Sequence, residues 1–231
     1  MKKTLSVITI ASSLAGSLLS SQAYAKIEGS YLGVDVLRSS TKAKGTSSLE
    51  NDNMNSNEPY YNQGNARDSD RGVGVNYKYA FNFNDFFVAP GISYDFLNNS
   101  MKANHASAIN NYFSQAVKLK SALSLRTNFG YDINDQFAFY IPVGISRFDY
   151  DIKTTDVTST KMVRTNKSNQ EFAAFIGVGF SYQPIKNWAV NLEYNKYQNL
   201  KLTSSTATID GGHIIVKTNV DMLKLGVSYK F

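Results

Sequence analysis

The chain has 231 residues, no cysteine, a formal net charge of +6 and an aromatic content of 13%. The absence of cysteine excludes disulfides and cysteine-ligated metals. The basic excess is small and forms no compact cluster in the sequence, so nucleic acid is not expected as a partner. No apolar stretch after residue 25 reaches the length of about 18 residues that a membrane-spanning helix needs.

The first 25 residues predict a signal peptide that is removed on secretion. Lys2 and Lys3 form a positive start, and a mostly apolar run follows from Leu5 to Leu19. Ala23-Tyr24-Ala25 then places small residues at the two positions that signal peptidase recognises. Serine and glycine interrupt the run and no basic stop-transfer cluster follows, which argues against a transmembrane helix. The expected mature chain is therefore 26–231.

Eight segments of the mature chain alternate between apolar and polar residues with a period of two. These expected strands cover about 30–39, 71–79, 86–97, 117–131, 136–148, 171–182, 188–197 and 217–231. Such alternation is typical of strands with one face toward lipid and one toward a lumen. In 117–131 it places Val117 and Leu119 outward. The sequence therefore predicts an all-β protein, an eight-stranded antiparallel transmembrane up-and-down β-barrel.

The connections between these strands alternate in length. Short turns are expected at about 80–85, 132–135 and 183–187, and long loops at about 41–70, 98–116, 150–170 and 198–216. The short turns contain Asn or Asp, whose side chains bond to nearby backbone and tolerate left-handed conformations. Outer-membrane barrels place short turns in the periplasm and long loops outside the cell. The four long loops are therefore expected at the cell surface.

The end of the chain carries a second secretion-related pattern. From Leu223 to Phe231, five apolar or aromatic residues share one face, and the series closes on Tyr229 and Phe231. This ending resembles the C-terminal signal by which bacterial outer-membrane barrels are recognised for assembly. The resemblance implies Tyr229 and Phe231 as the assembly signal and the barrel assembly machinery as a partner.

Taken together, the signal peptide, the four hairpins and the ending Val227-Ser228-Tyr229-Lys230-Phe231 resemble a known group of small outer-membrane β-barrels. This group includes opacity-type surface antigens and the surface adhesins of obligate intracellular alphaproteobacteria. The resemblance implies a surface antigen or adhesin whose extracellular loops bind ligands. The partners it implies are outer-membrane lipid, lipopolysaccharide and host-cell surface proteins.

Within the first long loop, Tyr60 and Tyr61 are the candidate ligand-binding residues. They stand among Asn and Ser, and tyrosine in such loops provides contact area at a low cost in entropy. The loop residues of this group share little sequence, so no role is carried over to them from relatives.

The lumen-facing positions are rich in polar side chains, which predicts a plugged interior. Arg126 lies five residues from the periplasmic end of its strand and Glu193 lies five residues from that of its own, so the two should meet. Unpaired charges would be costly inside the barrel. The other inward residues expected are Asp35, Asn76, Lys78, Asp95, Lys118, Asn128, Asn191, Lys224 and Lys230. An eight-stranded barrel holds side chains rather than a wide channel. A small porin-like or purely structural protein is the alternative function.

The sequence predicts no enzyme, although a lipid-modifying enzyme is a further alternative. The only two histidines, His105 and His213, fall in expected external loops, with Ser107 and Asp210 as the nearest possible catalytic partners. Neither histidine stands in a spacing typical of a metal site. No catalytic residue, metal or cofactor is therefore assigned.

Overall fold

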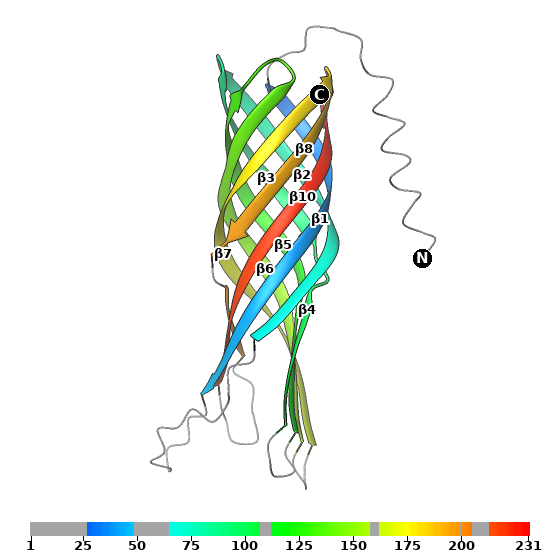
Figure 1. Cartoon of the computed structure of the whole chain (residues 1–231), viewed down its shortest axis with the longest axis vertical. Coiled ribbons are helices and arrows are strands. Elements are labelled where there is room, and N and C mark those ends of the chain that lie inside the picture. The colour runs from blue at the N-terminus through cyan, green and yellow to red at the C-terminus, as the bar shows by residue number, and fades with distance from the viewer. Residues whose placement is uncertain (1–26, 49–64, 107–111, 158–161, 199, 205–212) are drawn as a thin grey trace, which may run out of the picture.

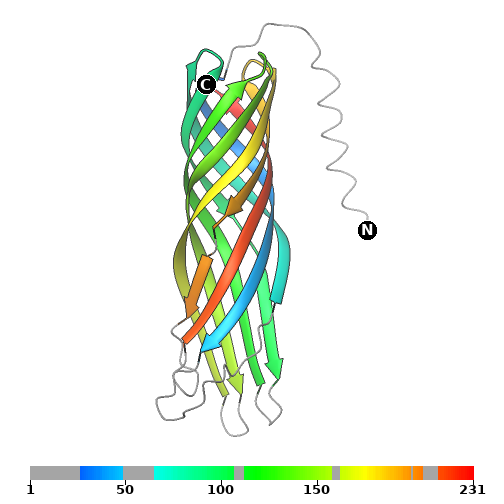
Figure 2. The ribbon, with the colours of Figure 1, turned by 60° about the vertical axis from the view of Figure 1, so that its left-hand side comes forward.

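The computed structural model describes residues 27–48, 65–106, 112–157, 162–198, 200–204 and 213–231. It contains ten strands wound about one axis (Figures 1 and 2): β1 (Gly29–Ser48), β2 (Asn65–Phe83), β3 (Phe86–Phe96), β4 (Ser100–Ala106), β5 (Tyr112–Asp132), β6 (Phe137–Val157), β7 (Met162–Ile185), β8 (Trp188–Tyr197), β9 (Leu200–Ser204) and β10 (His213–Lys230). No helix among these residues is long and apolar enough to span a membrane. The expected signal peptide lies outside the described residues.

The strands close into one antiparallel ring in the order β1-β2-β3-β5-β6-β7-β8-β10, and β1 pairs with β10 to complete it. β4 also pairs with β5, in continuation of β3, and β9 also pairs with β10, in continuation of β8. The ring therefore has eight strand positions, two of which hold interrupted strands. This confirms the predicted eight-stranded barrel.

The short turns at one end of the barrel are built on asparagine, as the sequence predicted. Asn84, between β2 and β3, has a left-handed backbone with φ of 62°. In the next short turn, the side-chain oxygen of Asn134 accepts hydrogen bonds of 2.9 Å from the backbone N–H groups of Gln136 and Phe137. Local side-chain bonds of this kind stabilise a tight reversal of the chain.

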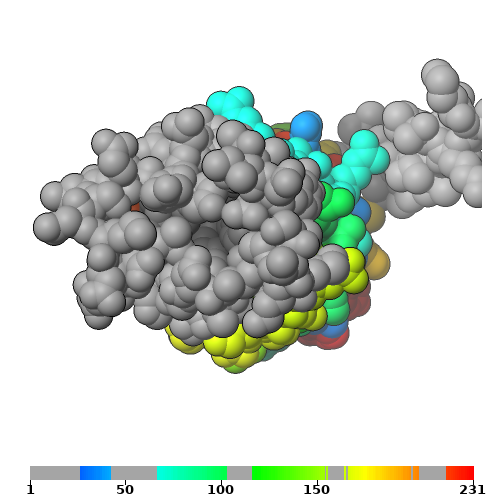
Figure 3. Space-filling view, turned by 90° about the horizontal axis from the view of Figure 1, so that it is seen from below, coloured from blue at the N-terminus to red at the C-terminus, as the bar shows by residue number. Residues whose placement is uncertain are grey.

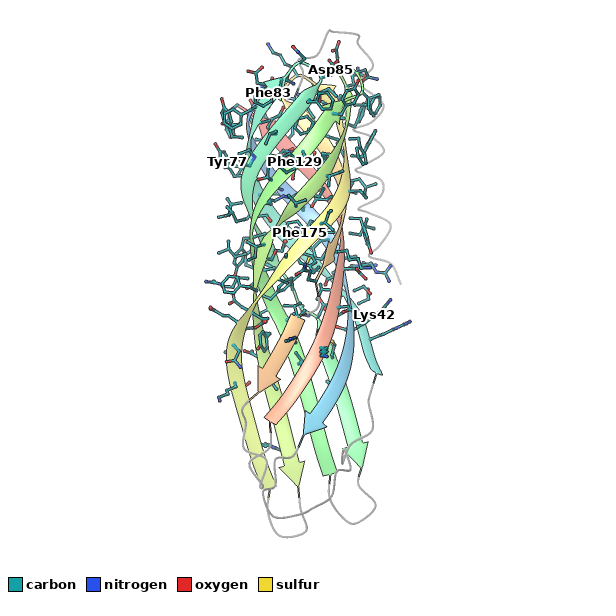
Figure 4. All side chains as sticks on the ribbon, turned by 90° about the vertical axis from the view of Figure 1, so that its left-hand side faces the viewer. Lys42, Tyr77, Phe83, Asp85, Phe129 and Phe175 are labelled. Atoms are coloured by element: carbon teal, nitrogen blue, oxygen red, sulfur yellow. The ribbon has the colours of Figure 1, made fainter. Side chains whose placement is uncertain are left out.

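A belt of exposed apolar side chains surrounds the barrel near these turns. It includes Val34 on β1, Val75 on β2 and Leu225 on β10. Aromatic rings gather at its end near the short turns, where the Phe86 and Tyr131 ring centroids lie 5.1 Å apart and those of Trp188 and Tyr229 also lie 5.1 Å apart. Figure 4 shows Tyr77 and Phe83 on this part of the barrel. An apolar band edged by aromatic residues is typical of the lipid-facing surface of an outer-membrane barrel.

The strands continue well beyond the limits expected from the sequence. β1 extends to Ser48, β6 to Val157, and β7 begins at Met162. The expected loop ranges 41–70, 98–116, 150–170 and 198–216 were therefore too wide. Beyond the apolar belt the alternation persists with its faces exchanged, so a search for apolar outward faces ends the strands too early.

β5 shows this exchange most directly, and here the sequence-based assignment was wrong. The register between β5 and β6 shifts between Leu119 and Ser121. Val117 and Leu119 are buried inside the barrel, while Lys118 and Lys120 are exposed on its outside. A one-residue bulge moves every side chain beyond it to the other face of the sheet. Lys118 is therefore not a lumen residue.

Candidate functional site

The centre of the lumen is occupied by an ion pair between β5 and β8. The structure brings Arg126 and Glu193 together: Arg126 Nη1 donates to Glu193 Oε1 at 2.9 Å, and Nη2 donates to Oε2. Tyr140 donates its hydroxyl proton to Oε2 at 3.2 Å, and the Asn195 amide donates to Oε1 at 2.6 Å. Each carboxylate oxygen thus receives two hydrogen bonds, which offset much of the cost of burying its charge.

A second ion pair and two polar contacts extend this layer across the barrel. Lys224 of β10 lies 2.5 Å from Asp95 of β3, and both side chains are almost fully buried. The Asn76 amide donates to Asp35 at 2.7 Å. The Lys78 ammonium lies 5.3 Å from the centre of the Tyr31 ring. We call all of these residues the polar layer; its members are Tyr31, Asp35, Asn76, Lys78, Asp95, Arg126, Tyr140, Glu193, Asn195 and Lys224.

The space left within the polar layer is small. The cavity has a volume of about 30 Å³, and its lining includes Asp35, Asn76, Lys78, Arg126, Tyr140 and Glu193. One water requires roughly 10–15 Å³ on this measure, so the cavity has room for about two waters. Close packing contributes to this: a methyl group on Gly179 would collide with the Tyr140 ring. The arrangement is a filled interior rather than an open pore.

On the side of the polar layer away from the short turns, the lumen is filled by apolar side chains. We call this cluster the apolar plug; its members are Leu37, Leu97, Met101, Val117, Leu119, Ala122, Phe148, Tyr150, Ile152, Ala173, Phe175, Tyr197, Leu200, Leu202, Val220 and Met222. The Tyr197 ring centroid lies 5.1 Å from that of Phe148 and 5.0 Å from that of Phe175. Phe175, labelled in Figure 4, also contacts the Arg126 guanidinium and so joins the plug to the polar layer.

The outer wall around the apolar plug is charged rather than apolar. On β6, Phe148, Tyr150 and Ile152 are buried inside, whereas Asp151 lies on the outer face. Lys120 lies 2.8 Å from Asp151. The hydrogen bonds that Asp151 accepts from Lys120 and from the Ser168 hydroxyl lower the pKa of its carboxyl. This part of the barrel has an apolar interior and a hydrated surface, as a water-soluble domain does.

The remaining site residues predicted from the sequence have different outcomes. Tyr60 and Tyr61 lie outside the described residues, as do Ser107 and Asp210. His105 and His213 were expected in loops, but they stand on β4 and at the start of β10. The strands reach these positions because the alternation continues beyond lipid. Among the described residues, no group of three potential metal ligands is close enough together to hold an ion.

The end of the chain lies on the lipid-facing side of the barrel. Tyr229 packs between Trp188 and Phe231, with ring centroids 5.1 Å and 5.3 Å away. Both Tyr229 and Phe231 are exposed. Their role as an assembly signal stays a prediction.

Sequence reasoning missed Tyr140 and the apolar plug. Tyr140 shares its parity on β6 with Ala138 and Pro142, which are also buried, so the alternation alone could have placed it in the lumen. Met101, Tyr150, Ile152, Leu200 and Leu202 of the plug stand outside the expected strands, and the β5 bulge concealed Val117 and Leu119. Other members, such as Phe148 and Phe175, stand on the lumen-facing parity of expected strands, so the alternation could have placed them inside.

A closed ring of eight strand positions with an apolar, aromatic-edged outer belt defines an integral outer-membrane β-barrel. Residues 28–231 match the OmpA-like transmembrane domain, so the chain belongs to that family and resides in the outer membrane. No curated protein matches the chain.

Solved structures of outer-membrane proteins align with the chain. The outer membrane protein OprG from Pseudomonas aeruginosa aligns with a TM-score of 0.53 and 10% identity, covering 88% of this chain and 96% of that one. The attachment invasion locus protein Ail of Yersinia pestis aligns with a TM-score of 0.41 and 16% identity, covering 89% of this chain and all of that one. At these identities the likeness concerns the fold alone.

Proposed function

We propose that the chain is a surface antigen or adhesin, in which a closed barrel holds ligand-binding loops away from the membrane. The observation that carries the proposal is the extent of the strands beyond the lipid-facing belt. Among the β6 side chains that the structure describes, the last exposed large apolar residue is Ile145, and the strand continues to Val157. With about 3.4 Å per residue and a tilt of roughly 40°, this adds about 30 Å of barrel beyond the lipid.

The filled interior supports the same proposal. The apolar plug closes the part of the lumen that lies beyond the belt, and the polar layer leaves a cavity of only about 30 Å³. A general porin needs a continuous aqueous path, whereas a protein that presents loops gains rigidity from a packed interior. Figure 3 views the molecule from the end at which the strands extend furthest.

The proposed partners are host-cell surface proteins. Binding to such proteins is the activity implied by the resemblance to opacity-type antigens and alphaproteobacterial adhesins. The structure sharpens the experiment, because trimming the originally expected loops would cut into paired strands. The variants should instead shorten only 49–64, 107–111, 158–161 and 205–212, which lie between strand ends.

Adhesion is measured after expression in a non-adherent Gram-negative host. We expect the full chain to increase binding to host cells and the shortened variant to lose that increase. Heat-modifiable migration in the outer-membrane fraction should be equal for both, which controls for insertion. A Tyr60→Ser/Tyr61→Ser variant tests the first loop separately. A correctly inserted full chain that gives no binding would contradict the adhesin proposal and favour a structural role.

Conductance tests the porin-like alternative. In planar bilayers we expect no stable porin-sized steps from the purified chain, because the plug and the polar layer fill the lumen. Large, long-lived steps would overturn the closed-barrel part of the proposal.

We also propose that the chain is not an enzyme. His105 and His213 stand on β4 and β10, which do not pair with each other. This placement gives no support to a joint histidine site. The mass of lipid A from cells that express the chain should therefore be unchanged, and a new lipid A species would contradict this part of the proposal.

A further inference from the structure

Immediately beyond the apolar belt, one side of the barrel carries an excess of exposed cations. They come from β2, β1, β10, β8 and β9; β1 and β10 lie side by side across the front of Figure 1. We call this set the basic sector; it consists of Arg38, Lys42, Arg67, Arg71, Lys196, Lys201 and Lys217. Figure 4 shows Lys42 extending away from the wall of the barrel. Asp221 is the outward carboxylate among the described residues of this sector, and it stands directly opposite Lys196.

Several of these cations face one another directly across neighbouring strands. Arg38 is opposite Arg71, and Lys42 is opposite Arg67. Lys201 is likewise opposite Lys217. Opposite residues of an antiparallel pair have Cβ atoms about 4.5–5.5 Å apart, and like charges at such positions destabilise the sheet. The sequence thus places repulsive pairs three times in one sector.

No carboxylate of the described residues offsets this repulsion through an ion pair. The ion pairs of the outer wall, Lys120 with Asp151 and Arg147 with Asp149, lie on β5 and β6, on another side of the ring. Arg38 does bond to the Ser69 hydroxyl, but that group is neutral. Among the described residues, an external anion would therefore find exposed donors without a carboxylate partner at the opposed cations, Arg38 and Arg71 foremost.

The depth of the basic sector indicates which anion it fits. Arg38 occupies the outward position next to the exposed Val36, and Arg71 the outward position next to the exposed Val73. The next outward position lies about 7 Å along a strand. These guanidinium groups thus stand at the upper edge of the lipid-facing belt, on the side wall of the barrel. Phosphate groups of outer-leaflet glycolipids lie at this level, just outside the hydrocarbon.

We propose that the basic sector is a docking surface for the phosphorylated headgroups of outer-leaflet glycolipid. Arginine is suited to phosphate because its planar guanidinium can donate two parallel hydrogen bonds. The first row, Arg38, Arg71 and Lys196, contacts the phosphates, and the second row adds positive charge above them. A bound phosphate offsets the repulsion between Arg38 and Arg71, the like-charged pair of the first row. The inference does not depend on ligand binding by the loops.

The test uses the full mature chain refolded into phosphatidylcholine vesicles, with and without bisphosphorylated lipid A. The docking variant is Arg38→Gln/Arg71→Gln/Lys196→Gln. The matched control, Lys102→Gln/Lys118→Gln/Lys153→Gln, removes the same charge from exposed positions on β4, β5 and β6. The readout is the temperature at which the compact form is lost on heating.

Lipid A should raise this temperature by several degrees for the wild type and for the matched control, since a ligand that binds only the folded state stabilises it. The docking variant should lose most of this shift, and dephosphorylated lipid A should give little shift with any chain. In neutral vesicles the docking variant should be at least as stable as the wild type, because the repulsion between the opposed Arg38 and Arg71 is gone.

Three results would overturn the proposal. The first is an undiminished response of the docking variant to lipid A. The second is stabilisation of the wild type by soluble heparin but not by lipid A, which would indicate a polysaccharide surface. The third is a loss of stability of the docking variant in neutral vesicles, which would show that these side chains support the barrel itself.

Discussion

The two halves of the barrel place their apolar side chains on opposite faces. In the half near the short turns, Leu125 and Ile145 are exposed on the outside while Arg126 and Glu193 fill the interior. In the half beyond the belt, Phe148 is buried and the outer wall is charged. We call this the upper half and the half near the short turns the lower half, although Figure 1 draws the short turns at the top. One continuous sheet therefore serves two solvents, because apolar groups face lipid in one half and avoid water in the other.

The chain makes this exchange in two ways. On β1, β3 and β10 an apolar doublet marks the boundary: Val36 and Phe96 are exposed, and the adjoining Leu37 and Leu97 are buried, as Met222 is beside the exposed Leu223. On β5 the sequence keeps its phase, and the bulge near Lys120 exchanges the faces instead. The comparison teaches that periodicity has to be interpreted separately on each side of the lipid boundary.

The largest expected difference between the two halves comes from truncating one aromatic residue in each. Phe148→Ala removes a fully buried ring from the apolar plug and should lower the free energy of unfolding by about 3–5 kcal/mol. Phe129→Ala removes a ring that is half exposed on the belt and should cost about 1 kcal/mol or less. Denaturant unfolding in one detergent measures both. Equal losses would mean that the upper half is not packed as a core.

Substitutions in the polar layer of the lower half have a different effect, because the stability of the layer depends on the pairing of its buried charges. Arg126→Leu leaves Glu193 buried without its cation and should cost about 3–5 kcal/mol. The double variant Arg126→Leu/Glu193→Leu should cost clearly less, since it leaves no unpaired charge. The same unfolding measurement applies. If the single and double variants lose equal stability, the two side chains do not act as a pair.

A smaller effect is expected at the charged wall of the upper half. The pKa of Asp151 is lowered in the folded chain, so its stabilising contribution is present above the ordinary carboxyl pKa and is lost as the pH falls through the folded value. Because the pair is exposed to solvent, Asp151→Asn should cost less than about 1 kcal/mol near neutral pH. Unfolding measured from neutral pH into the acid range should show this difference shrink as the carboxyl is protonated. A difference that persists in acid would contradict the assignment.

Much of the membrane half could be predicted from the sequence. Its strands alternate in one phase. Counting residues from the turn end of each strand was enough to predict that Arg126 and Glu193 meet in the lumen. The asparagine turns were also visible, because Asn84 and Asn134 act through local geometry. These features depend on short-range patterns or on a single repeating period.

The upper half could not be predicted in the same way. A bulge such as that near Lys120 depends on the register of two strands, and a single strand's sequence does not reveal it. Lys118 was therefore placed inside, and β4 and β9 were read as loops. The doublets Val36-Leu37 and Phe96-Leu97 were the available signal, since two adjacent apolar residues break a two-residue period.

The most direct test of the exchanged faces is single-cysteine labelling on β5, because the chain contains no native cysteine. Lys118→Cys and Leu119→Cys variants would be treated with a membrane-impermeant maleimide on intact cells. The structure predicts rapid labelling at position 118 and none at 119 until the barrel is unfolded. Rapid labelling at 119 with protection at 118 would show that β5 keeps one phase throughout, and the closed, water-exposed upper barrel would then be wrong.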